Sequence, residues 1–142
     1  MESNEKTMIS IQATINAPFH KVWGYWTQPE HISNWNHASD DWHTTFAEND
    51  LRVGGKFLSR MEAKDGSMGF DFSGYYTNIK ENELIEFILD DERKVKVEFQ
   101  KADDQTILKE HFEVELTNPL ELQRQGWQAI LNQFKQYVES DV

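Results

Sequence analysis

The stretch from Gly126 to Val138 reads GWQAILNQFKQYV, and it decides the fold because its hydrophobic period is that of a helix. Its large apolar residues recur three and four positions apart, which places them on one face of an amphipathic helix. The pattern predicts a long helix that begins near Leu120, directly after Asn118-Pro119, and ends by Ser140. The residues of the apolar stripe are Trp127, Ile130, Leu131, Phe134, Tyr137 and Val138.

The chain before this helix, from Trp42 to Leu116, has the two-residue period of β-strands instead. Phe57, Ser59 and Met61 alternate with Lys56, Leu58, Arg60 and Glu62, and turn sequences such as Asp65-Gly66 separate successive segments. Because the connections are short, consecutive strands should pair antiparallel as a meander. The expected strands cover residues 42–47, 56–62, 70–76, 84–89, 94–99 and 106–116.

The N-terminal part of the chain predicts one more strand and two short helices. Ile9, Ile11, Ala13 and Ile15 alternate with polar residues, which is typical of a strand with one buried face. Pro18 suits the first turn of a helix that carries Val22, Trp23 and Trp26, and a second short helix should follow Pro29 with Ile32 and Trp35.

Length, charge and cysteine content limit the classes of protein to which the chain can belong. The chain has 142 residues, which suits one domain over residues 1–142, and we expect residues 1–6 to be disordered. Its 25 acidic and 14 basic residues give a net charge of −11, which argues against binding to nucleic acid or to anionic lipid. There is no cysteine, so a disulfide framework and thiolate metal sites are excluded.

Two further absences in the sequence concern localisation. The polar N-terminal residues lack the apolar segment of a secretory signal, and no apolar run approaches the ~20 residues of a spanning helix. We therefore expect a cytoplasmic protein without membrane insertion.

The order of the elements predicts an α+β fold. A curved antiparallel sheet of about six or seven strands would wrap around the long C-terminal helix, with the two short helices after the first strand. A sheet that curls over one helix leaves a space that side chains fill only in part, and small apolar ligands bind in such spaces. The aromatic share of 13% fits this geometry, because large rings bridge the gap with few residues.

Five groups of residues form recognisable motifs. They are Ala17-Pro18 with Val22-Trp23, Pro29-Glu30-His31 with Trp35, Val53-Gly54-Gly55-Lys56-Phe57, Gly74, and Gly126-Trp127. These motifs resemble those of the helix-grip superfamily called SRPBCC, which includes START lipid-transfer domains. More narrowly, the chain resembles the bacterial relatives of the activator of heat-shock protein 90 ATPase. The resemblance covers roughly residues 7–138 and implies the helix-grip fold, whereas one such fold hosts several functions.

Ten residues are the candidates for a ligand site, because they belong to the concave face, the second short helix or the long helix. Plain core packing is the competing interpretation for each ring. The candidates are Trp35, Phe57, Phe72, Tyr76, Phe87, Glu110, Phe112, Trp127, Leu131 and Phe134.

Glu110 is the carboxylate that stands out, because it lies between Leu108 and Phe112 on the expected concave face. Burial there would raise its pKa, and a neutral acid facing a cavity can donate a hydrogen bond or a proton to a ligand. The alternative is that Glu110 lies near the rim or pairs with Arg60, Lys56 or a tyrosine hydroxyl.

Histidines and acids crowd the segment after the first strand, but their spacing does not fit a metal site. Gaps of six residues separate His31, His37 and His43, and neither helical nor strand ligand sets have this spacing. We expect no metal and no cofactor; these histidines, with Asp40 and Asp41, would lie near a pocket mouth. His111, on the opposite face of its strand from Glu110, should be exposed to solvent.

Three functional hypotheses follow. The first, which we rank above the others, is a non-enzymatic domain that binds a small hydrophobic molecule, such as a lipid, a polyketide or a flavonoid-like compound. The second, implied by the resemblance, is a co-chaperone that binds a heat-shock protein 90 homologue, with a role in stress response. The third is a cyclase or dehydratase in which Glu110, with His31 or Tyr76, transfers a proton. We expect a monomer or weak dimer.

Overall fold

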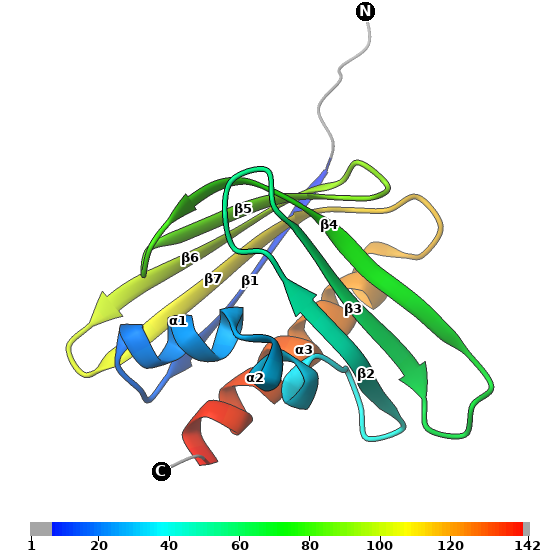
Figure 1. Cartoon of the computed structure of the whole chain (residues 1–142), viewed down its shortest axis with the longest axis horizontal. Coiled ribbons are helices and arrows are strands. Elements are labelled where there is room, and N and C mark those ends of the chain that lie inside the picture. The colour runs from blue at the N-terminus through cyan, green and yellow to red at the C-terminus, as the bar shows by residue number, and fades with distance from the viewer. Residues whose placement is uncertain (1–6, 141–142) are drawn as a thin grey trace, which may run out of the picture.

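One sheet runs through the whole molecule, which a computed structural model describes for residues 7–140 (Figure 1). The expectation for residues 1–6 lies outside the described residues. The sheet has seven strands in the order β1-β7-β6-β5-β4-β3-β2, and every neighbouring pair is antiparallel. Only β1 pairs with a strand distant in sequence. The strands are β1 (Met8–Ile15), β2 (Trp42–Asn49), β3 (Lys56–Ala63), β4 (Gly69–Lys80), β5 (Leu84–Leu89), β6 (Lys94–Ala102) and β7 (Gln105–Glu113).

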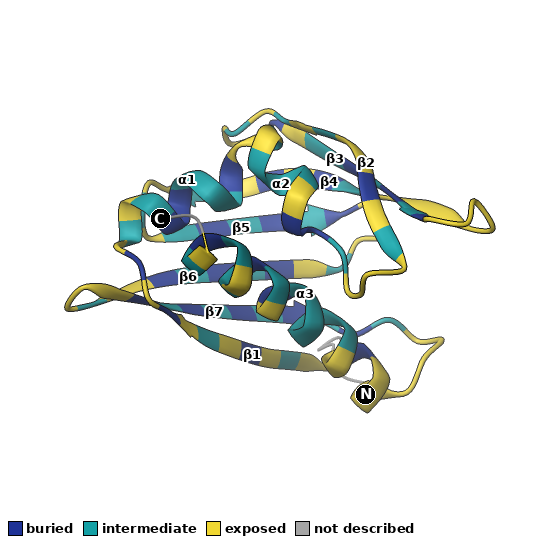
Figure 2. Ribbon diagram, turned by 90° about the horizontal axis from the view of Figure 1, so that it is seen from below, coloured by how far each residue is buried: buried dark blue, intermediate teal, exposed yellow. Residues whose placement is uncertain are grey.

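The helices all lie on one face of this sheet, the face that the curl makes concave (Figure 2). α3 (Leu120–Ser140) packs chiefly against β1, while α2 (Pro29–Trp35) packs against β2 and α1 (Phe19–Thr27) joins the two. The predicted α+β helix-grip architecture is therefore confirmed. No helix of the described part of the chain is long and apolar enough to cross a bilayer.

Irregularities in β2 and β4 accompany the curl of the sheet. The register shifts between Thr44 and Phe46 and again between Tyr76 and Asn78, as β-bulges do. At Gly74 the sheet is so tight that a Cβ atom would lie 2.3 Å from the carbonyl oxygen of Ile88. Bulges of this kind bend the strand that carries them and increase its local twist, which fits the curl of the sheet.

The predicted turn at Gly54-Gly55 fastens the β2–β3 loop to β4. The Gly54 amide donates a hydrogen bond to the Tyr76 carbonyl over 2.8 Å, and the Tyr76 amide donates one to the Gly55 carbonyl over 3.0 Å. Gly54 has a φ of 86°, which glycine adopts without strain. A Cβ at Gly55 would lie 2.0 Å from the Asp50 carbonyl oxygen, so the loop requires glycine there as well.

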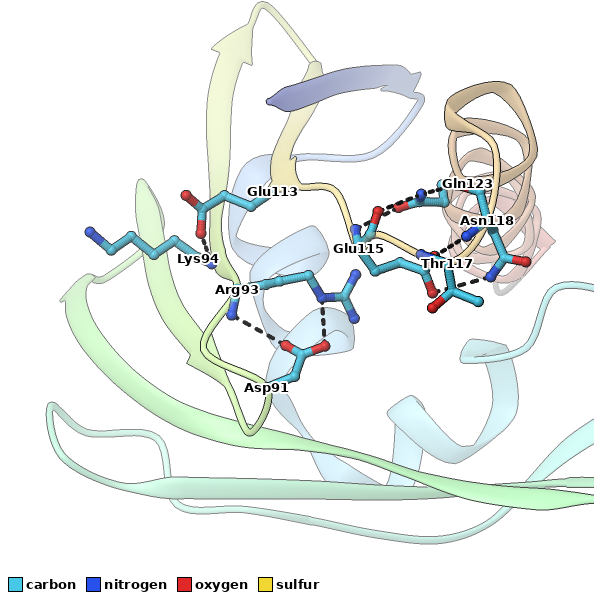
Figure 3. Close-up of polar contacts among 8 residues, drawn as sticks. All are labelled: Asp91, Arg93, Lys94, Glu113, Glu115, Thr117, Asn118 and Gln123. Atoms are coloured by element: carbon cyan, nitrogen blue, oxygen red, sulfur yellow. Dashed lines mark hydrogen bonds and ion pairs between the residues drawn. The ribbon is translucent and has the colours of Figure 1, made fainter. Parts of the chain in front are cut away.

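The last strand ends earlier than the sequence pattern predicted, at Glu113 instead of Leu116. The reason is a polar turn around Glu115, whose carboxylate accepts the amides of Thr117 (3.0 Å) and Asn118 (2.5 Å). Gln123 on α3 completes the turn by bonding to the Glu115 backbone (Figure 3). Leu116 continues the alternation in sequence but is 99% exposed. Local hydrogen bonds thus override the hydrophobic period.

Candidate functional site

A cavity of about 230 Å³ lies between the concave face of the sheet and the helices. Side chains from α1, α2, β2, β3, β4, β5, β7 and α3 surround it, so the closure of the sheet over the helices positions its walls. Seven of the ten candidate residues line it: Trp35, Phe57, Phe72, Tyr76, Phe87, Glu110 and Trp127.

The other three candidates, Phe112, Leu131 and Phe134, are fully buried behind the lining residues. The Trp127 indole covers Phe112, with ring centroids 3.9 Å apart and planes at 8°. Phe134 contacts the lining ring of Trp35 edge-on at 4.8 Å. These three residues are therefore core residues that support the cavity wall from behind. Core packing was the competing interpretation for them.

Sequence reasoning missed several lining residues. Trp26 and Ile85 could have been predicted from periodicity. Trp26 shares a helix face with Val22, and Ile85 shares a strand face with Phe87. Arg93 and Asn36 follow a turn or a helix end, where no period applies. The remaining missed lining residues are Ile32, Glu48, Asn49, Ser59, Met61, Phe70 and Ile130.

The sheet side of the cavity is a cluster of aromatic rings centred on Phe57. Its ring lies 5.0 Å from Phe87, 5.4 Å from Tyr76 and 5.8 Å from Phe72, centroid to centroid. Trp127 from α3 reaches the edge of this cluster, 6.0 Å from Phe72. Such ring contacts favour flat or compact apolar ligands, which offer faces and edges to the same geometry.

Glu110 projects from β7 into this apolar cavity. Its residue is 6% exposed, and its strand neighbours in register are Ile11 on β1 and Val97 on β6. Among the residues that the structure describes, the Glu110 side chain has neither a hydrogen-bond partner nor an ion-pair partner. Burial alone raises the pKa of its carboxyl to about 8.

The pairings that the sequence left open for Glu110 are wrong. Arg60 bonds to Glu62 and Asp71 instead, at 3.1 Å and 3.3 Å. Lys56 is exposed. Glu110 is therefore a buried acid whose hydrogen-bonding capacity is available to whatever enters the cavity.

Tyr76 lines the cavity but its hydroxyl is already engaged. It donates to the side-chain oxygen of Asn49, whose amide donates in turn to the Thr27 carbonyl over 2.6 Å. Burial raises the pKa of the Tyr76 hydroxyl well above its ordinary value. This chain links β4, β2 and the end of α1, so the phenol is neutral and held in place.

Arg93 brings a positive charge to the cavity from the end of the β5–β6 hairpin. Its Nε donates to Asp91 over 2.7 Å (Figure 3), and its side chain is 18% exposed. The neighbouring Lys94 amide donates to the Glu113 carboxylate over 2.6 Å, which joins the hairpin to the end of β7. Asp91 balances the Arg93 charge, and the cavity end stays close to neutral.

His31 does not face the cavity. Its Nδ1 hydrogen-bonds the Tyr137 hydroxyl over 2.7 Å, and its ring stacks on Tyr25 with centroids 4.0 Å apart. His31 thus joins α2 to α3, and its ring is held outside the cavity by these contacts. The hypothesis that it assists proton transfer finds no geometric support.

The remaining histidines also lie outside the cavity. Burial, followed by the charge of Lys64, lowers the pKa of His37, whose Nδ1 has no hydrogen-bond partner among the residues that the structure describes. His111 is half-buried instead of exposed, because its ring bonds to Ser10 (2.7 Å) and Glu98 (2.8 Å) on the convex face. Within residues 7–140 no group of three or more histidine and acidic side chains is placed to hold a metal ion.

Comparison with solved structures identifies close relatives of this fold. An AHSA1-like protein from Aeromonas hydrophila, solved by NMR, is 44% identical with a TM-score of 0.90, covering 94% of this chain and 93% of its own. A solution structure from Cytophaga hutchinsonii is 50% identical with a TM-score of 0.81, covering 94% and 92%. A crystal structure from Chromobacterium violaceum shares the fold at 22% identity and a TM-score of 0.82, covering 93% and 96%.

No curated protein matches the chain significantly. The family model described as "Activator of Hsp90 ATPase homolog 1-like protein" matches residues 16–139, nearly the whole chain. This match contains every motif on which the sequence resemblance depended. The chain therefore belongs to the family of Activator of Hsp90 ATPase homolog 1-like proteins and has their SRPBCC helix-grip fold.

Proposed function

We propose that this protein binds a compact, mainly aromatic molecule in the cavity between the sheet and α3. The observation that carries the proposal is the cavity itself, whose walls are aromatic and which contains one buried acid, Glu110, that has no partner among residues 7–140. Ligand sites in proteins combine apolar walls with a few placed polar groups in this way.

The size of the cavity narrows the class of ligand. Its volume of about 230 Å³ lies just below the roughly 300–1,000 Å³ typical of pockets for drug-sized molecules. A molecule of two or three rings, such as a polyketide or a flavonoid-like compound, suits it better than a long-chain lipid. The edge and face contacts that the Phe57 cluster offers favour rings for the same reason.

Binding is a better account of the cavity than cyclase or dehydratase chemistry. Proton-transfer catalysis at a carbonyl compound needs an acid and a base within reach of one substrate. Glu110 would serve as one of these, but the Tyr76 hydroxyl is bonded to Asn49 and His31 is bonded to Tyr137. The geometry therefore supports holding a ligand more directly than converting it.

Native mass spectrometry of the protein purified from its own host tests this function. We expect an added mass that corresponds to a small organic molecule and that is lost on denaturation. The matched control is Ser59→Phe, because Ser59 is buried and lines the cavity, so the new ring would fill the space. A folded Ser59→Phe variant that retains the same added mass would contradict binding in this cavity.

The family description favours a second candidate, in which the chain binds a heat-shock protein 90 homologue. Its net charge of −11 would steer it toward a basic surface on that partner. The test is the ATPase rate of the chaperone homologue from the same host with and without this protein. An unchanged rate, together with no binding by calorimetry at low salt, would rule this candidate out.

A further inference from the structure

The unpartnered carboxyl of Glu110 restricts what the cavity can accept. A polar group buried without a hydrogen bond destabilises the state that contains it, unless water or a ligand supplies the bond. In the empty cavity, water can serve this purpose. A purely apolar ligand would displace the water and leave the carboxyl unsatisfied, so it would bind poorly for its size.

We propose that the ligand presents an oxygen acceptor, such as a ketone or quinone carbonyl, to the neutral Glu110 carboxyl, which donates a hydrogen bond to it. This inference rests on the proposed function and names the class of molecule that the cavity selects: aromatic carbonyl compounds. It also makes binding dependent on the proton of Glu110.

The neutral form of Glu110 follows from its surroundings. On the sheet it is flanked by Ile11 and Val97, and from α3 the lining residues are Trp127 and Ile130, none of which titrates. With a pKa of about 8, the carboxyl is protonated at pH 7 in a ratio of roughly ten to one. It is then a donor, and the complementary group on the ligand is an acceptor.

The titratable and charged residues that line the rest of the cavity do not change this assignment. Glu48 on β2 is exposed to solvent, and the Tyr76 hydroxyl on β4 donates to Asn49. Arg93, directly before β6, is paired with Asp91. No basic group of the described cavity wall is thus bonded to Glu110 to draw off its proton.

An arylalkyl amine is the opposing ligand class, because its ammonium cation would pair with an ionised Glu110 and interact with the aromatic rings. The two classes differ in the sign of their pH dependence. A carbonyl ligand requires the protonated acid, so its affinity should fall above pH 8. An ammonium ligand requires the carboxylate, so its affinity should rise over the same range and a proton should be released on binding.

The experiment measures dissociation constants by calorimetry for two probes of the same shape, 2-acetonaphthone with a carbonyl and 2-ethylnaphthalene without one. At pH 7 the wild-type protein should bind 2-acetonaphthone at least about fivefold more tightly. Between pH 7 and pH 9 the affinity for 2-acetonaphthone should fall about tenfold, because the fraction of protein with a protonated Glu110 falls by that factor.

Two variants separate hydrogen bonding from shape. Glu110→Gln keeps a donor but does not titrate, so the preference for the ketone should persist and its pH dependence should vanish. Glu110→Met has no donor, so the preference should fall to about one. Should Glu110→Met not fold, the wild-type pH profile and Glu110→Gln still decide the question.

The outcomes distinguish this inference from the function on which it rests. Binding of neither probe to the wild type would contradict the proposed function. Equal affinities for both probes, or a ketone affinity that does not change up to pH 9, would overturn the role of Glu110 and leave the cavity as a ligand site. Tighter binding of 2-naphthylmethylamine than of the ketone, increasing with pH, would assign the site to amines instead.

Discussion

The indole of Trp127 on α3 lies flat against the ring of Phe112 on β7, with centroids 3.9 Å apart and planes at 8°. Phe112 is fully buried, whereas Trp127 also lines the cavity and reaches Phe72 on β4. The Trp127 side chain thus helps to hold the long helix on the sheet and also forms one wall of the ligand site. Stability and binding are linked at this residue.

Replacement of Trp127 by alanine should lower the free energy of unfolding by about 3 kcal/mol, because the stack on Phe112 and the buried area are lost together. Trp127→Phe is the matched control: it keeps a ring and should cost well under half as much. Urea denaturation measures both. A loss of about equal size in the two variants would show that the stack contributes little.

Glu110 should make stability fall as pH rises. Its pKa is about 8 in the folded protein against 4.5 as the ordinary value, so between these pH values the folded state holds a proton that the unfolded state has released. The free energy of unfolding therefore decreases across this window, by about 5 kcal/mol in total, and is constant above it with respect to this group.

The comparison with Glu110→Gln isolates that effect from other titrating groups, because glutamine carries no proton that titrates. The variant should become progressively more stable relative to the wild type from pH 5 to pH 8, as measured by chemical denaturation at each pH. A stability difference that stays constant over this range would mean that Glu110 has an ordinary pKa.

Two glycines should respond oppositely to alanine. At Gly126 in α3 a Cβ would meet nothing within 4 Å, so Gly126→Ala should stabilise the protein by up to about 1 kcal/mol through helix propensity. At Gly74 a Cβ would lie 2.3 Å from the Ile88 backbone oxygen, so Gly74→Ala should destabilise it by about 1–3 kcal/mol. Thermal unfolding of both variants provides the check, and destabilisation by Gly126→Ala would indicate an unseen close approach there.

Gln123 should control the turn between β7 and α3. Its side-chain amide donates to the carbonyls of Glu115 (3.1 Å) and Asn118 (2.8 Å), and its oxygen accepts the Glu115 amide over 2.9 Å (Figure 3). Gln123→Ala should cost about 1–3 kcal/mol and speed hydrogen exchange of the Glu115 amide. Gln125→Ala, which removes an exposed side chain of the same helix, should do neither.

The sequence predicted the order of the elements because period-two and helical patterns are strong in this chain. It failed at the end of β7, where the turn around Glu115 overrides the alternation that continues to Leu116. It also placed Phe112 in the cavity, because periodicity identifies the inner face of a strand but not which inner residue another ring covers.

The candidate site, like the fold, could be predicted in part from the sequence. Glu110 could be recognised from its position between apolar residues on one strand face, and its burial agrees with that. Its lack of a partner could not be predicted, since this depends on the pairing of Arg60 with Glu62 on β3 and with Asp71 on β4. Arg93 was missed because a hairpin end follows no hydrophobic period.

The central claim, that the cavity binds an aromatic ligand, is tested most directly by the indole N–H signals in proton–nitrogen NMR spectra during titration with 2-acetonaphthone. Trp26, Trp35 and Trp127 line the cavity, whereas Trp23 and Trp42 do not. Saturable shifts of the first three signals, with Trp42 unchanged, are the predicted result. No shift at saturating probe, or equal shifts of all five indoles, would contradict it.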